Sequence, residues 1–224
     1  VSRQDFDLAE TQLRAALRLA RTFRQPDRKV VVSLNNLAIV HSQRGQFALA
    51  EPLLNEALQV TVAINGENHA NTAECLFNLA MVHLQTGKID DAIADAERGA
   101  AITAKPAKGS APDFAACLVQ AAQLLAQKGD AERTETVLLK SVDVTGKQFG
   151  ADHPRVAIAL ASLATLYRSQ ERFEAAKKSL IESLRILEND ESAPRSALAL
   201  VLNNLGTVYQ QQGQLQKAEP LLQK

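Results

Sequence analysis

The chain has 224 residues, of which 46% are hydrophobic, and its 25 Lys and Arg residues balance its 25 Asp and Glu residues. A net charge of zero produces no overall field that would attract a nucleic-acid backbone or an anionic lipid surface, so we expect no nucleic-acid partner. No apolar run approaches the 18 or so residues of a membrane span, so we also expect no membrane insertion.

The first predicted element is an amphipathic helix over residues 5–24. Apolar and small residues recur in it at helical spacing, at Phe6, Ala9, Leu13 and Ala16. The same pattern returns in the second half of every unit that follows. We therefore interpret residues 5–24 as an orphan copy of the second helix of a repeat, called helix B below.

Residues 29–66 form the first complete unit, and much of its sequence returns near the end of the chain. The stretch LNNLAIVHSQRGQFALAEPLL begins at Leu34, and LNNLGTVYQQQGQLQKAEPLL begins at Leu202. In both copies, apolar residues three, four and seven positions apart predict one amphipathic helix before the glycine and another after it. Each unit is therefore a first helix, called helix A below, then a tight turn and helix B.

The later units follow at a constant period of 42 residues, as from Gly45 to Gly87. Gly45, Gly87, Gly129 and Gly213 stand at the predicted turns, and Glu171 occupies the turn of the fourth unit. Glycine suits the left-handed backbone that ends a helix. We therefore expect Glu171 either to adopt that conformation at an energetic cost or to turn differently. The predicted units after the first span residues 69–105, 111–149, 153–190 and, truncated, 194–224.

The recurring sequences resemble the kinesin-light-chain type of tetratricopeptide repeat. That type is typified by LNNLA, found here at residues 34–38, by EPLL at 51–54, and by GADHP at 150–154, of which 66–69 is a weaker copy. The resemblance covers essentially the whole chain. It implies an all-α fold, a right-handed superhelical solenoid of helix-turn-helix repeats in which helix A lines the concave side.

The resemblance also implies where a partner would bind, because helix A positions beside the buried residues would face the concave groove. Amides are frequent there, and each offers both a donor and an acceptor to a peptide backbone. In this repeat type the second Asn of the pair is a groove residue. Asn36, Asn78 and Asn204 match that position, which Gln120 and Ser162 occupy in the third and fourth units. The predicted peptide-binding groove residues are Asn35, Asn36, Gln43, Asn78, Gln85, Gln120, Gln123, Ser162, Arg168, Asn203, Asn204 and Gln211.

Two other interpretations of these positions exist. Each asparagine could simply be solvated or bond to a neighbouring helix, and the sequence leaves that alternative open. A clamp for a terminal carboxylate would require Lys or Arg at several groove positions. Arg168 is the main cationic residue among them, so we do not expect a carboxylate clamp.

Histidines are the first candidates for chemistry. His41 and His83 occupy the aromatic position of helix A in adjacent units, where packing is the simplest interpretation, and neither has a partner at metal-ligand spacing. His69 and His153 recur in the loops that precede helix A. That recurrence favours helix capping over catalysis.

Cys75 and Cys117 lie one repeat period apart, at equivalent positions of neighbouring units. Packed helices lie about 8–10 Å apart, beyond the reach of about 7 Å between the Cα atoms of a disulfide. We therefore predict two free, buried cysteines and expect a cytoplasmic protein. We predict no enzymatic activity, no cofactor and no metal site.

The predicted function is a non-enzymatic protein–protein interaction module that binds a partner's peptide segment in its concave groove. Two alternatives stay open: a structural scaffold that self-associates through exposed ends of the array, and the sensor segment of a larger signalling protein. Because the sequence starts at Val1 and stops within a repeat at Lys224, we expect a piece of a longer array whose ends could carry a targeting signal.

Overall fold

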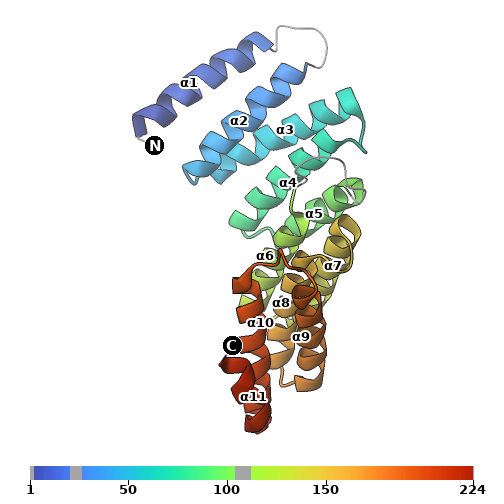
Figure 1. Cartoon of the computed structure of the whole chain (residues 1–224). Helices are drawn as coiled ribbons and strands as arrows, with labels where there is room; N and C mark the ends of the chain where they lie inside the picture. Colours follow the sequence, from blue (N-terminus) through green and yellow to red (C-terminus); the bar gives the residue numbers. More distant parts are fainter. Residues whose placement is uncertain (1–2, 21–26, 104–111, 224) are drawn as a thin grey trace. The chain divides into compact units, whose positions relative to one another are not determined.

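The computed structural model describes residues 3–20, 27–103 and 112–223, and every regular element within these ranges is a helix (Figure 1). The prediction of an all-α repeat fold is confirmed. The helices of the described residues are α1 (Arg3–Ala20), α2 (Arg28–Gln43), α3 (Phe47–Asn65), α4 (Ala70–Gln85), α5 (Ile89–Thr103), α6 (Phe114–Gln127), α7 (Ala131–Phe149), α8 (Pro154–Ser169), α9 (Phe173–Glu188), α10 (Arg195–Gln211) and α11 (Leu215–Leu222).

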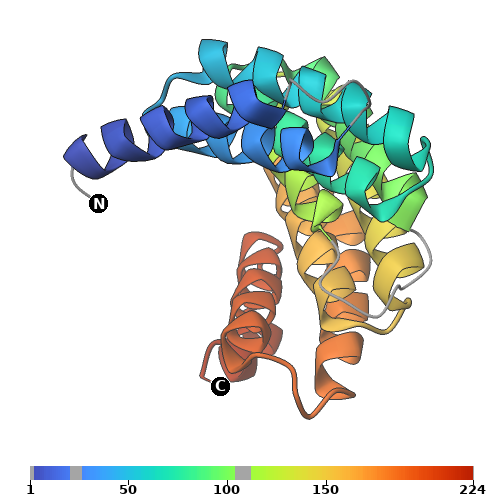
Figure 2. The ribbon, with the colours of Figure 1, turned by 90° about the horizontal axis from the view of Figure 1, so that it is seen from above.

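The repeating unit is a pair of packed helices joined by a short turn. Helices α2 and α3 pack against each other across residues 44–46, and α4–α5, α8–α9 and α10–α11 form equivalent pairs. Helix B of one unit also packs against helix A of the next, as α1 does on α2 (Figures 1 and 2) and as α9 does on α10. This alternation buries one stripe of every helix, which is how repeat proteins build a core from units that are too small to have one alone.

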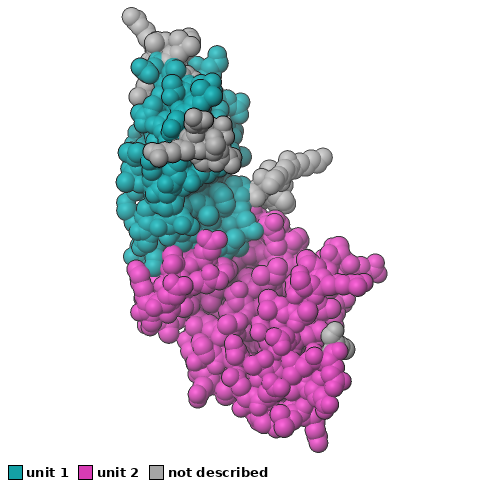
Figure 3. All heavy atoms as spheres, turned by 90° about the vertical axis from the view of Figure 1, so that its left-hand side faces the viewer, with its two compact units in different colours: residues 1–103, 107–117 teal, residues 104–106, 118–224 magenta. Residues whose placement is uncertain are grey.

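The chain also divides into two compact parts, called unit 1 and unit 2, each of which contains more than one repeat (Figure 3). Unit 1 comprises residues 1–103 and 107–117, and unit 2 comprises residues 104–106 and 118–224. The ends of the predicted segments at residues 21–24, 104–105, 111 and 224 lie outside the described residues.

The core of unit 1 is filled by the leucines that recur in helix A and by one aromatic ring. Leu34 and Leu76 are fully buried, and so is Phe114, which meets Phe77 edge to face with 5.7 Å between the ring centroids. The Phe114 ring lies directly on α5 at Gly99, where an added Cβ would come within 2.2 Å of the ring. Close packing at this point therefore requires a residue without a side chain.

A residue in the left-handed conformation ends helix A at each tight turn. The φ angle is 71° at Gly45 and 58° at Glu171, so Glu171 adopts the conformation that its position requires. The turn is closed by the amide of Arg172, which donates to the carbonyl of Tyr167 at 2.9 Å. A side chain makes this conformation about 1–2 kcal/mol less favourable than it is for glycine.

Histidine side chains cap two of the A helices. Nδ1 of His69 accepts a hydrogen bond from the amide of Asn71 at 3.1 Å, and Nδ1 of His153 accepts one from the amide of Arg155 at 3.2 Å. The predicted capping role of both histidines is confirmed. Capping satisfies amides at the start of a helix that would otherwise lack a partner.

Helix α3 is long and apolar enough, by length and composition alone, to cross a membrane. No such helix was expected from the sequence. The helix nevertheless packs between α2 and α4, with Ala50, Leu54 and Ala57 buried in the interfaces. Helices of soluble proteins can meet the same length and composition criteria, so this feature alone does not indicate a membrane span.

Candidate functional site

Most of the predicted groove residues lie on the side of helix A that faces away from the buried leucines, called the open face below. On α2, Leu34 and Leu37 are buried, whereas Asn36 and Gln43 are exposed and, being seven residues apart, share one side of the helix. The others are likewise exposed or half-buried, and none is in the core. They are Asn78 and Gln85 on α4, Gln120 and Gln123 on α6, Ser162 and Arg168 on α8, and Asn203, Asn204 and Gln211 on α10.

Asn35 is the exception, because it faces a neighbouring helix. Its Nδ2 lies 4.0 Å from Sγ of Cys75 on α4, and its Oδ1 is buried without a hydrogen-bond partner. Cys75 and Cys117 are free and buried, as predicted. Burial raises the pKa of the Cys75 thiol and raises that of Cys117 to about 12. Both cysteines are therefore packing residues, and the thiol of Cys117 stays protonated at neutral pH.

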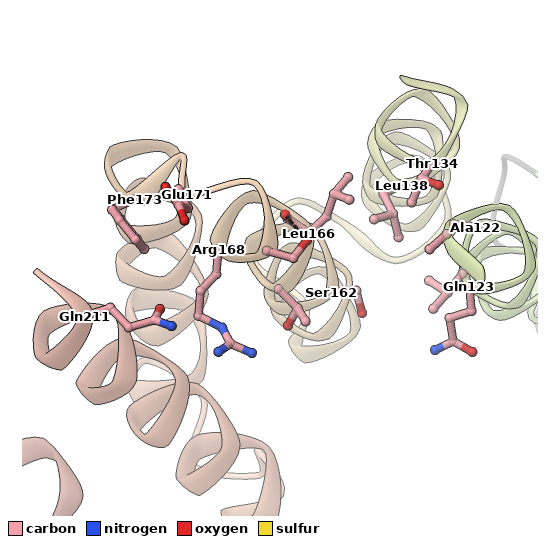
Figure 4. A pocket seen from close by; sticks show the side chains of 14 residues that line it. Ala122, Gln123, Thr134, Leu138, Ser162, Leu166, Arg168, Glu171, Phe173 and Gln211 are labelled. Atoms are coloured by element: carbon pink, nitrogen blue, oxygen red, sulfur yellow. Dashed lines mark hydrogen bonds between the residues drawn. The ribbon is translucent and has the colours of Figure 1, made fainter. Parts of the chain in front are cut away.

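Within unit 2, four of the predicted residues line a single pocket of about 520 Å³ (Figure 4). They are Gln123, Ser162, Arg168 and Gln211, which come from α6, α8 and α10. The remaining predicted residues do not line it. A pocket of this volume falls in the range of sites that hold small ligands or a few peptide residues.

Small and apolar side chains form the floor of this pocket. Ala122 and Leu138 are buried there, and Leu166 and Ala126 complete the apolar lining. One repeat earlier, the position equivalent to Ala126 is filled by the buried Leu84.

Polar side chains form the rim. The hydroxyls of Ser162, Thr165 and Ser169 donate to carbonyls of their own helix at 3.2, 3.0 and 2.7 Å. Their protons are therefore engaged, and their oxygens remain able to accept a hydrogen bond from a ligand. Gln123 and Gln211 each add an amide donor and an amide acceptor.

Two opposite charges lie on the rim without pairing with each other. Arg168 forms no ion pair with any described residue, and its Nε is buried without an acceptor. Glu171 likewise forms no ion pair within the described part of the chain. Figure 4 shows the Arg168 guanidinium extending away from Glu171, which lies beside Phe173 at the start of α9. Neither charge has a counterion among the described residues; Arg168 is half-buried and Glu171 is exposed.

The aromatic position of helix A instead forms structural contacts with helix B of its own repeat and of the preceding repeat. His83 is buried, with Nδ1 2.9 Å from Asp95 and Nε2 3.5 Å from Glu51. In unit 2, the hydroxyl of Tyr167 donates to Glu135 at 2.9 Å. The predicted packing role of this position is confirmed, and its carboxylate partners were not predicted.

These contacts also shift the titration of the groups involved. The hydrogen bond to Asp95 raises the pKa of His83, although burial partly opposes the shift. Burial is the largest cause that raises the pKa of Tyr167, and the hydrogen bond with Glu135 raises it further.

The described residues contain no cluster of three or more His, Cys, Asp or Glu that could hold a metal ion. We interpret the contacts of His83 and Tyr167 as structural, because they join helices within one repeat and between neighbouring repeats.

Several pocket residues were missed at the level of sequence, although a signal for them exists. Thr165 and Ser169 follow Ser162 by three and seven positions, so helical spacing places all three on one side of α8. The sequence indicates Glu171 only as a turn residue.

Sequence models described as tetratricopeptide repeat match most of the chain. One matches residues 2–61, 29–105 and 113–189, and a second matches residues 198–224. A comparison with curated protein sequences gives no significant match.

Solved structures with the same repeat fold include kinesin-light-chain-like proteins. BtubC (BKLC) from P. vanneervenii is 24% identical with a TM-score of 0.69, and the match covers 97% of this chain and 88% of that one. A putative kinesin light chain of Podosopora anserina with nearly identical TPR-like repeats is 23% identical with a TM-score of 0.57, over 90% of this chain and 94% of that one. YrrB, a TPR protein with an unusual peptide-binding site, is 13% identical with a TM-score of 0.53, over 93% and 89%.

Proposed function

The chain belongs to the tetratricopeptide repeat family, and we propose that it is a non-catalytic protein-interaction module whose open face holds a peptide segment of a partner protein. One observation carries the proposal. Neutral hydrogen-bonding side chains occupy the open face of successive A helices, and in unit 2 they surround a pocket of about 520 Å³ with an apolar floor.

The amides suit recognition of a peptide backbone. Each carries one acceptor oxygen and two donor hydrogens, whereas every peptide unit offers one donor and one acceptor. Asn36 and Asn78 lie one repeat period apart, on the open faces of α2 and α4 in unit 1. Contacts of this kind would hold an extended segment without reading its sequence, and pockets for individual side chains would supply the specificity.

The pocket of unit 2 would supply such a side-chain site. An apolar floor gains free energy by covering an apolar ligand side chain, and a polar rim fixes its orientation. The peptide-binding site named for YrrB, which has the same fold, is consistent with this use of the repeats. The described histidines have structural partners or caps, which also favours binding over catalysis.

The proposal is tested by selecting peptides from a displayed library of random 12-residue sequences on the whole chain. The affinity of the selected peptides is then measured for Asn36→Ala, Asn78→Ala and Asn204→Ala. Loss of an amide that bonds the ligand backbone is expected to weaken binding about tenfold. Asn55→Ala removes an exposed amide from α3, a B helix, and serves as the matched control. Unchanged affinity in all three open-face variants would exclude backbone recognition by these amides.

A scaffold that self-associates is the second candidate. It is favoured by α11, on which Leu215 is 65% exposed and Leu222 is 39% exposed. Apolar patches of this kind are common sites of protein association. Light scattering at rising protein concentration distinguishes the two functions, because a mass that stays monomeric contradicts the scaffold and leaves peptide binding unaffected.

A further inference from the structure

Building on the proposed function, we propose that the pocket of unit 2 selects a short peptide segment with opposite charges, in which an acidic and a basic side chain flank an apolar one. The acidic side chain would lie against Arg168, the apolar one on the floor formed by Ala122, Ala126, Leu138 and Leu166, and the basic one against Glu171. The two charges of the pocket and its apolar floor together carry this inference.

Arg168 supplies the positive pole. It is half-buried and lacks any ion pair among the described residues, and its Nε is shielded from solvent without an acceptor. An arginine held in this way is available to an anionic group of a ligand. A carboxylate is its best partner, because guanidinium and carboxylate can form two parallel hydrogen bonds.

Glu171 supplies the negative pole at a conformational cost. Gly45, Gly87, Gly129 and Gly213 hold the equivalent turns with φ between 71° and 77°, whereas Glu171 holds its turn at 58° with a side chain. The turn itself would be more stable with glycine. Within the described part of the chain, the Glu171 carboxylate forms no ion pair that would compensate this cost. A role in binding provides a reason for its presence.

The separation of the two charges determines the kind of ligand. If Arg168 and Glu171 paired, they would neutralise each other and the pocket would attract no charged group. They do not pair, and Figure 4 shows their side chains directed to different parts of the rim. A purely acidic ligand would leave Glu171 unpaired and facing a like charge. A ligand with both charges satisfies both poles.

The pocket volume limits the spacing of those charges. A cavity of about 520 Å³ is roughly 8 Å across, which accommodates about two or three extended residues at about 3.3 Å each. We therefore expect the acidic and basic residues to lie about two positions apart, with the apolar residue between them.

The test uses the displayed random 12-residue library on the whole chain and compares the wild type with three variants. Wild type should enrich peptides with the acid, apolar and base pattern. Arg168→Gln and Glu171→Gly should each bind the selected peptides about tenfold more weakly. The double variant Arg168→Glu with Glu171→Lys should enrich the same pattern with the charges in reverse order. Lys178→Gln and Glu188→Gln, which change exposed charges of α9, should leave affinity unchanged.

Stability measurements separate a binding effect from a folding effect. Glu171→Gly should raise the urea midpoint of unfolding, because it relieves the strained turn, while it weakens binding. Enriched peptides without the charge pattern, or equal affinity for wild type and Arg168→Gln, would overturn the inference and leave the proposed function intact. A library that enriches no peptide on the wild type would contradict the proposed function, and the inference with it.

Discussion

At the scale of single residues, the environment of His83 shows how the fold uses a titratable group. Its ring is buried between Asp95 on α5 and Glu51 on α3, and Glu51 also pairs with Lys88 at 2.7 Å. The core position of the ring was predictable from the sequence. The carboxylates were not, because Glu51 meets His83 only through the way α3 packs on α4, and sequence spacing does not define that register.

The raised pKa of His83 predicts that stability depends on pH. The protonated ring is favoured in the folded state by its hydrogen bond to Asp95. Its contribution is therefore complete below the unfolded pKa of about 6.5 and is lost as the pH rises through the higher folded pKa. Urea unfolding of the wild type should show a midpoint that falls from mildly acidic to mildly alkaline pH.

The control for this prediction is His83→Gln, which removes the titrating ring. The fall over that pH range should be smaller in the variant than in the wild type. Glu51 titrates in a different window, because its hydrogen bond with Lys88 lowers its pKa and any loss of its contribution comes only in acid. An identical pH dependence in wild type and variant would show that the contact of His83 with Asp95 does not stabilise the charged ring.

At the scale of helices and turns, periodicity was sufficient to predict most of the architecture. Buried positions recur with the period of the turn glycines, so each copy supports the assignment of the others, and even the turn at Glu171 follows from its place in the series. The pocket could not be predicted in this way. It depends on which side chains of α6, α8 and α10 come together and on the direction of the Arg168 side chain, which the sequence does not specify.

The contact between α5 and Phe114 gives a test at the same scale. Gly99→Ala would place a Cβ within 2.2 Å of the Phe114 ring. We expect a loss of about 1–3 kcal/mol in the free energy of unfolding from overpacking, although alanine favours the helix by about 1 kcal/mol. Gly146→Ala in α7 is the matched control, because nothing lies within 4 Å of its added Cβ.

The two glycine variants should therefore change stability in opposite directions in denaturant unfolding. Gly146→Ala should gain up to about 1 kcal/mol from helix propensity alone. A Gly99→Ala variant as stable as Gly146→Ala would mean that the Phe114 ring moves aside without cost. The close approach of the ring to α5 would then not contribute to the packing of unit 1.

At the scale of the whole molecule, repetition explains both what the chain has in common with its family and what it does not. Stacked helix pairs bury leucines on one side of each A helix. The other side carries polar residues together with exposed apolar ones such as Ile39 and Ile158. That arrangement is shared by proteins with many partners, so the fold alone does not specify a ligand. Specificity must come from departures from the repeat. Glu171 replaces a turn glycine, and Arg168 is the charged residue at a repeat position that holds Ser42, Leu84, Ala126 and Gln210 elsewhere, so two such departures lie in one pocket.

The most direct measurement locates a selected peptide on the chain. A peptide from the displayed library is synthesised with a photo-crosslinking phenylalanine analogue at its apolar position, irradiated with the wild-type chain, and the crosslinked residues are identified by mass spectrometry. We predict crosslinks to the open face and pocket floor on α6 and α8, at Ala126 or Leu166. Crosslinks to the exposed residues Leu139 on α7 or Ile181 on α9 would contradict binding at the open face.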